Sequence, residues 1–351
     1  MHMTRLLGLL LALVALTGSA AAQGPIWTDA NTASLGAPDL PTVPRAFRAV
    51  VLDRALLEAK LAAGDAVEIP IPLPEGGSMD VLVTEASIMA PELQARYPEI
   101  RTYLASGPGA VHGRLSYTPA GFGGMLFAPG GTVYIDPYSV GETEAYIVYR
   151  ASDLVADPAL RGRVGDEVLS EAPASPRRPG ASRSHGETLR TYRLAVAANG
   201  EYTQFHGGTV VLGLAAVVTA VNRVAGIYER DLAVSFQLVA NNDQIIYTNP
   251  STDPYSNSSA SIGQNQTNLD AVIGSANYDV GHVFTTGSGG LASLGVVCNT
   301  NFKARGTTGL PTPVGDAFYV DYVAHELGHQ FGGNHTFNGD SGSCSGGNRN
   351  G

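Results

Sequence analysis

Residues Val323–Phe337 read VAHELGHQFGGNHTF and gather three of the eight histidines of the chain into eleven positions. We expect a helix over about 319–331. Because an α-helix turns once in about 3.6 residues, His325 and His329 would project from one face, close enough to share an ion. Glu326 would point away from that face by about a quarter turn and could reach a nearby water without ligating the ion. The spacing therefore predicts half of a metal site.

The same stretch predicts a chain reversal after the helix. Gly332 would let the chain leave the helix with a positive φ, as C-terminal caps commonly require, and would carry His335 back towards the other two histidines. Three neutral imidazole nitrogens with one open position form the arrangement of catalytic zinc, whereas closed sets of four ligands are structural. We therefore predict one catalytic Zn²⁺ ion on these three histidines.

The pattern H-E-x-x-H-x-x-G-x-x-H, which runs from His325 to His335, resembles the signature of the metzincin zinc peptidases. The resemblance extends upstream to GGLASLGVVC, Gly289–Cys298, which is similar to the strand that forms the upper rim of the cleft in this family. Within the metzincins the chain is most similar to the reprolysin-like, or adamalysin-like, branch in its bacterial secreted form. The implied fold class is α+β. A β-rich N-terminal prodomain would precede a catalytic domain with a twisted, mostly parallel sheet, long helices and an active-site helix that carries HExxH.

The resemblance also implies roles for single residues. The three histidines would bind zinc, and Glu326 would act as the general base on a zinc-activated water. An extended peptide would lie against the rim strand, because a sheet edge binds a strand through its unpaired backbone groups. Gly289, Gly290 and Ala292 would then contact the substrate backbone. The implied function is a secreted zinc-dependent endopeptidase that acts on polypeptides and is made as a latent precursor.

The sequence departs from the family pattern after the third histidine. Metzincins are named for a methionine-containing turn that follows it, yet all five methionines here lie at or before Met125. The chain stops at Gly351, sixteen residues after His335. We therefore expect the sequence to be incomplete at its C-terminus. The alternative is a true end with an exposed site of weak zinc affinity, since unsupported ligands generally bind weakly.

The sequence determines neither the disulfide partners of its two cysteines, Cys298 and Cys344, nor the mechanism that would keep a precursor latent. They could pair with each other, whereas the resemblance implies partners beyond the third histidine and would leave both unpaired. The N-terminal region has no cysteine, so a thiolate on the metal cannot supply latency. A carboxylate, an imidazole such as His112 or His185, or simple steric cover remains.

The N-terminus predicts export. Arg5, an apolar run over 6–16 and small residues before Gln23 form a Sec-type signal peptide over 1–22. The run is too short for a membrane span of about 20 residues, and we identify no later run of that length. A glycan at the sequon of Asn334 would crowd the third histidine, which suggests that the sequons are coincidental and carry no glycan. This and the excess of arginine over lysine favour a bacterial source. We therefore expect a secreted bacterial protein.

The rest of the chain divides by pattern into three parts. Residues 23–153 show short β-like runs between Gly and Pro, which predict antiparallel strands with one buried face, and a helix within 45–64. Residues 154–187 are rich in Pro, Ser, Arg and Gly without a period, which indicates a linker that is either cleaved or an uncut spacer. From 188 to 351, strand, helix and strand alternate, which predicts parallel strands with right-handed crossovers.

Composition narrows the range of partners. Charged residues make up 15% of the chain and the net charge is -10, without a basic patch, so nucleic acid is not an expected partner.

The polar segment from Asn241 to Asp253 could bind calcium but lacks EF-hand spacing, so we treat it as a loop. We expect His282 to be a hydrogen-bonded core side chain and His206 to lie exposed in a Gly-rich turn.

Two other function classes remain beside the peptidase. One is a secreted binding or adhesion module with a structural or relict zinc site, and the other is a zinc hydrolase that acts on something other than peptides. The intact Glu326 favours an enzyme, because a relict site has no reason to keep the base. The rim-strand resemblance favours peptides as substrates. Side-chain preference and oligomeric state do not follow from the sequence.

Overall fold

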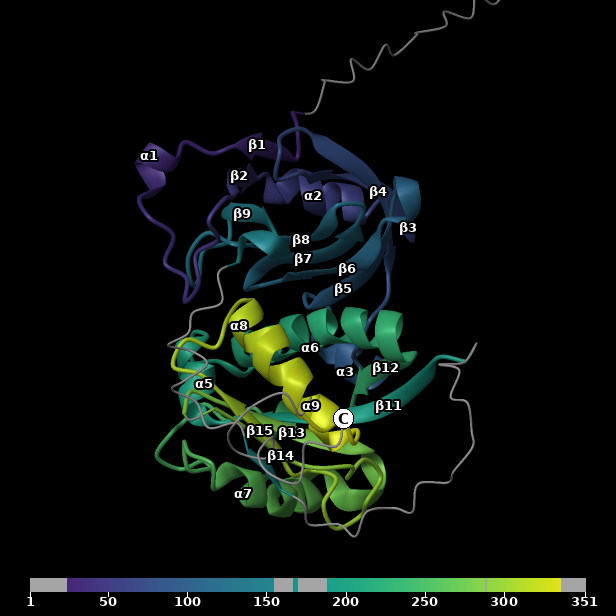
Figure 1. Cartoon of the computed structure of the whole chain (residues 1–351), viewed down its shortest axis with the longest axis vertical. Coiled ribbons are helices and arrows are strands. Elements are labelled where there is room, and N and C mark those ends of the chain that lie inside the picture. Colours follow the sequence, from purple (N-terminus) through teal and green to yellow (C-terminus); the bar gives the residue numbers. More distant parts are fainter. Residues whose placement is uncertain (1–23, 155–166, 170–187, 288, 336–351) are drawn as a thin grey trace, which may run out of the picture.

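The computed structural model describes residues 24–154, 167–169, 188–287 and 289–335. Two sheets organise these residues (Figure 1). We call residues 24–154 the first domain, and residues 188–335 together with the short strand at 167–169 the second domain. The predicted signal peptide lies outside the described residues.

The first sheet has nine strands in the order β1-β2-β9-β8-β7-β6-β5-β4-β3, all antiparallel. The strands are β1 (Trp27–Asp29), β2 (Arg48–Leu52), β3 (Ala66–Pro72), β4 (Ser78–Glu85), β5 (Arg101–Ser106), β6 (His112–Thr118), β7 (Gly121–Ala128), β8 (Gly131–Pro137) and β9 (Ala145–Arg150). The helices are α1 (Thr32–Leu35), α2 (Arg54–Leu61) and α3 (Pro91–Arg96), with 3-10 turns η1 (Pro108–Ala110) and η2 (Ala151–Asp153).

The helix predicted within 45–64 is only partly correct. Its first part is strand β2, which pairs with β9, and only Arg54–Leu61 is helical. The reason is a cap, because the Asp53 side chain accepts a hydrogen bond from the Leu56 amide at 3.0 Å and so starts the helix there.

The prediction of one buried face is wrong for the interior strand β9. Tyr146 and Val148 pack into one core with Leu57 of α2, while Ile147 and Tyr149 pack into another on the opposite face. Ile227 of the second domain packs against that second core. The far face of this sheet is therefore buried by the second domain together with first-domain residues such as Leu40 and Phe47.

The second sheet has six strands in the order β10-β14-β15-β13-β11-β12. The strands are β10 (Glu167–Leu169), β11 (Arg190–Ala198), β12 (Val234–Leu238), β13 (Val280–Thr285), β14 (Gly289–Ser293) and β15 (Gly306–Gly309). The helices are α5 (Gly200–Phe205), α6 (Val210–Leu232), α7 (Ser261–Leu269), α8 (Asp316–Phe318) and α9 (His325–Gln330), with short turns η3 (Asn242–Ile245), η4 (Asp270–Gly274), η5 (Ser275–Asn277) and the π-helical segment η6 (Tyr319–Ala324). The pairs are parallel except for β14 with β15, which is antiparallel.

Strand β10 lies inside the segment that the sequence predicts to be a linker. Its backbone pairs in parallel with β14, with Glu167 opposite Leu291 and Leu169 opposite Ser293. Three residues cannot show a period, so the pattern gave no signal for this strand.

Helix α6 is the longest helix among the described residues. Its apolar residues, including Leu214, Val221 and Tyr228, pack in the core with strands β11 and β12. By length and composition α6 could cross a membrane, which corrects the expectation of no second apolar run. However, 72% of its apolar window is buried inside the protein, as in a core helix.

Candidate active site

The three histidines of the opening stretch converge. The Nε2 atom of His329 lies 2.9 Å from that of His325 and 3.1 Å from that of His335, and the remaining pair is 3.2 Å apart. Nitrogen ligands at about 2.0–2.1 Å from a tetrahedral zinc ion would lie about 3.3 Å from each other. The donor set and its spacing therefore fit one zinc ion. Among the described residues, this is the one group of three or more metal-ligating side chains within reach of each other.

The end of α9 fixes the orientation of the second ligand. The Nδ1 atom of His329 lies 2.6 Å from the Gly333 carbonyl oxygen. Because a carbonyl only accepts, Nδ1 carries the proton, and the Nε2 lone pair is left for a metal. Gly332 has a φ of 95°, and its amide donates to the His329 carbonyl at 2.8 Å, which is the predicted reversal after the helix.

Glu326 is fully buried and packs against the rim strand. A Cβ atom placed on Gly290 of β14 would lie 1.7 Å from Oε1 of Glu326, so the carboxylate occupies space that only a glycine leaves open. Sequence reasoning assigned Gly290 to the substrate backbone and missed this contact, because it depends on how α9 packs on β14.

Tyr228 of α6 supports the start of α9. Its hydroxyl donates to the Ala324 carbonyl at 2.7 Å, one residue before the first histidine ligand. Burial raises the pKa of Tyr228, so the phenol keeps its proton and remains a donor. The sequence analysis assigned no role to Tyr228.

A buried polar network holds the other end of α9 to the sheet. The two ring nitrogens of His282 lie 2.9 Å from Gln330 Oε1 and 2.8 Å from Thr308 Oγ1. The Gln330 amide nitrogen donates to the Gly281 carbonyl at 2.8 Å. His282 is thus the buried, hydrogen-bonded side chain that the sequence predicts. Gln330 and Thr308 carried no sequence signal, since isolated polar residues have many uses.

The state of His282 gives a prediction for acid stability. Burial lowers the pKa of His282 to about 4, from about 6.5 in an unfolded chain. Its contribution to the free energy of unfolding is therefore full above about pH 6.5 and is lost as the pH falls towards 4. In metal-free protein we expect this free energy to fall by up to about 1.4 kcal/mol per pH unit for this group in that window.

Urea unfolding at several pH values measures the slope, and His282→Gln should reduce it. His206 provides a comparison, because burial also lowers its pKa to about 4 and His206→Gln should act in the same direction. An unchanged slope in both variants would show that neither imidazole is held neutral by the fold.

Several sequence predictions fall outside this site. His206 is half-buried rather than exposed, because its ring packs on Tyr202 with centroids 4.5 Å apart. His112 is exposed and hydrogen-bonds the Ala110 carbonyl, while His185 and Cys344 lie outside the described residues. Cys298 is exposed.

The polar segment from Asn241 to Asp253, which the sequence analysis treats as a loop, uses its carboxylates within the protein. Asp243 forms an ion pair with Arg96 at 2.8 Å, and Asp253 accepts hydrogen bonds from the Gly200 and Tyr255 amides. Within the described residues, these side chains form no cluster of metal ligands.

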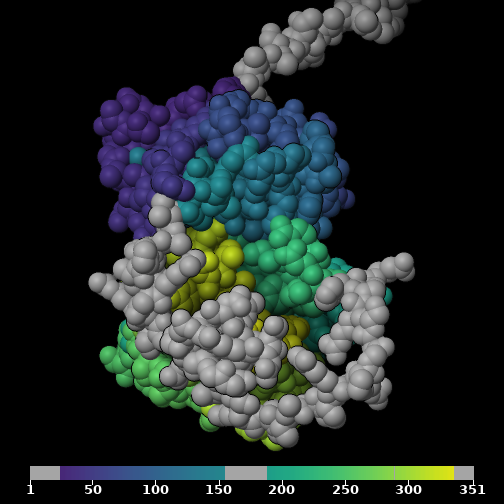
Figure 2. Space-filling model, in the orientation of Figure 1, coloured from purple at the N-terminus to yellow at the C-terminus, as the bar shows by residue number. Residues whose placement is uncertain are grey.

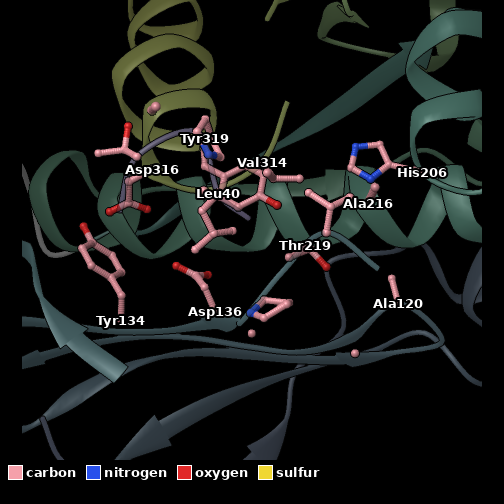
Figure 3. Close-up of a pocket in the computed structure, with 18 of the residues that line it drawn as sticks. Leu40, Ala120, Tyr134, Asp136, His206, Ala216, Thr219, Val314, Asp316 and Tyr319 are labelled. Atoms are coloured by element: carbon pink, nitrogen blue, oxygen red, sulfur yellow. The ribbon is translucent and has the colours of Figure 1, made fainter. Parts of the chain in front are cut away.

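A cavity of about 1230 Å³ lies between the domains and reaches the site. Its lining includes Leu40 and Asp136 of the first domain, Thr219 of α6, and His325 and Glu326. Figure 3 shows Asp136 and Tyr134 on the first-domain strands, on the opposite side of the cavity from Asp316 and Tyr319.

A family model described as "Metallo-peptidase family M12B Reprolysin-like" matches residues 188–350. The second domain belongs to the reprolysin-like metallopeptidases. Peptidases of this family hydrolyse polypeptides and typically use zinc, and the histidine cluster of this reprolysin-like domain lies within the matched residues.

The chain is similar to the crystal structure of metalloproteinase-II from Bacteroides fragilis, with 12% identity and a TM-score of 0.45 over 82% of this chain and 86% of that chain. A comparison with curated protein sequences finds no match.

Proposed function

We propose that the protein is a secreted zinc-dependent endopeptidase, made as a latent precursor. His325, His329 and His335 would hold the zinc ion, and Glu326 would be the general base. The observation that carries the proposal is the convergence of three Nε2 atoms within 3.2 Å of each other, two of them on a helix whose glutamate packs against the rim strand.

The residues divide the chemistry between them. A bound zinc ion supplies a Lewis acid that activates water and polarises the scissile carbonyl. The Glu326 carboxylate would take a proton from the attacking water and give it to the leaving amine. Burial of Glu326 against Gly290 holds the carboxylate beside the histidines, and the bond from Tyr228 to Ala324 fixes the start of its helix.

The substrate would be an extended polypeptide. Strand β14 pairs with β15 on one side, and its other side accepts a further strand, as the pairing with β10 demonstrates. A peptide that adds here would be held by backbone hydrogen bonds, with Gly289, Gly290 and Ala292 as contacts. The alternative function, a secreted binding or adhesion module, has less support, because a binding module does not need the general base that Glu326 would provide.

The position of β10 supports latency by steric cover. Residues Glu167–Leu169 already pair with Leu291–Ser293, which is the edge that a substrate would need. The blocking strand lies between the two domains in sequence, so proteolysis on both sides of β10, which releases the strand while the domains stay together, is the proposed activation step. Export would follow from the predicted signal peptide over 1–22.

The primary test is digestion of a reduced, unfolded protein by the chain after cleavage on both sides of β10. We expect hydrolysis that a chelator abolishes and added Zn²⁺ restores. His329→Ala should remove both activity and bound zinc, because two imidazoles are left to hold the ion. A zinc-loaded, cleaved protein without hydrolysis would contradict the proposal and favour a metal-stabilised binding module.

Latency has a separate test in the uncleaved chain. Replacing both Val168 and Leu169 with proline removes two successive backbone donors, so β10 can no longer pair with β14. We expect peptide hydrolysis to rise at least several-fold over the unaltered chain. Threonine at the same two positions keeps the donors and should leave the chain latent. Equal activity of the two double variants would show that β10 is not the block.

A further inference from the structure

The first domain supplies part of the hydrophobic core of the second. The side chains of Ile88, Met89, Leu93 and Ile100 are at most 3% exposed and belong to one core cluster with α6, β11 and β12. Leu93 lies on α3, which Figure 1 shows beside α6 and β12. The core of the second domain is therefore incomplete without residues from the first.

The backbone of the first domain also extends the second sheet. The Ala90 amide donates to the Leu238 carbonyl at 2.8 Å, and the Leu238 amide donates to the Ile88 carbonyl at 2.6 Å. Leu238 belongs to β12, the strand at the edge of the second sheet. Removal of the first domain would leave the amide and carbonyl of the buried Leu238 unpaired at this edge, which is unfavourable.

A buried ion cluster joins the domains over the middle of α6. Arg223, which is 3% exposed, lies between Asp136 of β8 at 2.5 Å and Asp316 of α8 at 2.8 Å. Its guanidinium also lies over the rings of Tyr134 and Tyr319, which come from opposite domains (Figure 3). Loss of Asp136 would remove one partner of a buried charge, which strongly destabilises such clusters.

A second polar contact involves Asn222 and Glu229 of α6. Arg114 of β6 forms an ion pair with Glu229 at 2.6 Å and donates to the Asn222 side chain at 3.0 Å. Asn222 in turn donates to the Leu115 carbonyl at 3.0 Å. Figure 2 shows the first domain seated directly on this part of the second. The outer face of α6 is thus an interface and not a solvent surface.

We propose that the first domain is a permanent part of the folded enzyme and not a segment that is released. After cleavage between residues 170 and 187, the two fragments stay bound as a non-covalent complex, and the part from 188 onwards does not keep its fold alone. The partner of this surface is the first domain of the same chain. The inference goes beyond the proposed function and does not depend on peptidase activity.

Cleavage of the whole chain tests this directly. A recognition sequence for a site-specific protease is inserted between residues 170 and 187, in a Glu326→Gln background that prevents self-digestion. After cleavage, gel filtration at moderate salt should give one peak that contains both fragments and elutes with the uncleaved chain. Two peaks, each with a cooperative unfolding transition, would overturn the proposal.

Unfolding of the intact chain gives an independent measurement. Trp27 of the first domain is the single tryptophan, while α6 in the second domain is the longest described helix. Tryptophan fluorescence and the helical circular dichroism signal should therefore change at the same urea concentration. Separate midpoints, with helical signal left after the fluorescence change, would overturn the proposal.

Two leucines of the first domain provide a matched pair. Leu93 is fully buried in the shared core, whereas Leu104 is 44% exposed. Leu93→Ala should shift both midpoints to lower urea by the same amount, and Leu104→Ala should shift neither. A Leu93→Ala variant that moves only the tryptophan midpoint would contradict a shared core. If this variant does not fold, the cleavage experiment still decides the question.

Discussion

Glu326→Gln is expected to lower the turnover number for peptide hydrolysis by about 10²–10⁴-fold, the usual contribution of a general base. Glutamine has nearly the same shape as glutamate but cannot accept a proton at neutral pH. The side chain is fully buried between α9 and β14, so the replacement should fit without repacking. The measurement is hydrolysis of a fluorogenic peptide by the chain cleaved on both sides of β10.

Zinc content separates the role of this residue from that of the ligands. Glu326→Gln should bind one zinc ion per chain, as the unaltered protein does, whereas His329→Ala should not. Glu326→Asp tests position, because a carboxylate shorter by one methylene keeps the chemistry but loses reach. A glutamine variant that keeps most of its turnover would exclude Glu326 as the base.

Gly290→Ala is the second substitution with a large expected effect. The added methyl group would lie 1.7 Å from Oε1 of Glu326, well inside contact distance, so the carboxylate must move. A displacement of about 1 Å at a catalytic group can cost about 10²-fold in rate. We therefore expect a fall of about 10²-fold in turnover with zinc content unchanged, although Gly290 has no reactive group.

The matched control is Gly263→Ala in α7, where a new methyl group would meet no atom within 4 Å. That variant should keep full activity and stability. A Gly290→Ala variant that changes only the Michaelis constant would point to a substrate contact alone, as the sequence analysis supposed. Full activity would show that the carboxylate is not confined by β14.

The sequence predicts this site well where the geometry is local. The spacing of His325 and His329 depends only on the helical turn, and His335 depends on one reversal at Gly332. The position of Glu326 against Gly290 was not predictable, because residues 36 apart come together only when α9 packs on β14. The hydrogen bond between His282 and Gln330 was equally unpredictable, because it too joins residues far apart in the sequence.

The assignment of residues to the two domain cores was less predictable than the helices and strands. The change of composition at residue 154 marks a joining segment, but composition does not show which core a side chain enters. Ile88 and Leu93 lie well before that point and still pack with α6. Strand β9 likewise lacks an exposed face because a separate part of the chain covers it, and strand alternation reports only the faces that water reaches.

The pairing of Ala90 with Leu238 also constrains the order of folding during synthesis. The two residues are 148 positions apart, and the N-terminal one leaves the ribosome first. Until β12 is made, the apolar side chains of Ile88 and Leu93 have no core to enter. Contacts of such long sequence separation form slowly, and exposed apolar surface favours aggregation in the meantime. A cell that makes this protein must therefore shield the nascent first domain until β12 has been made.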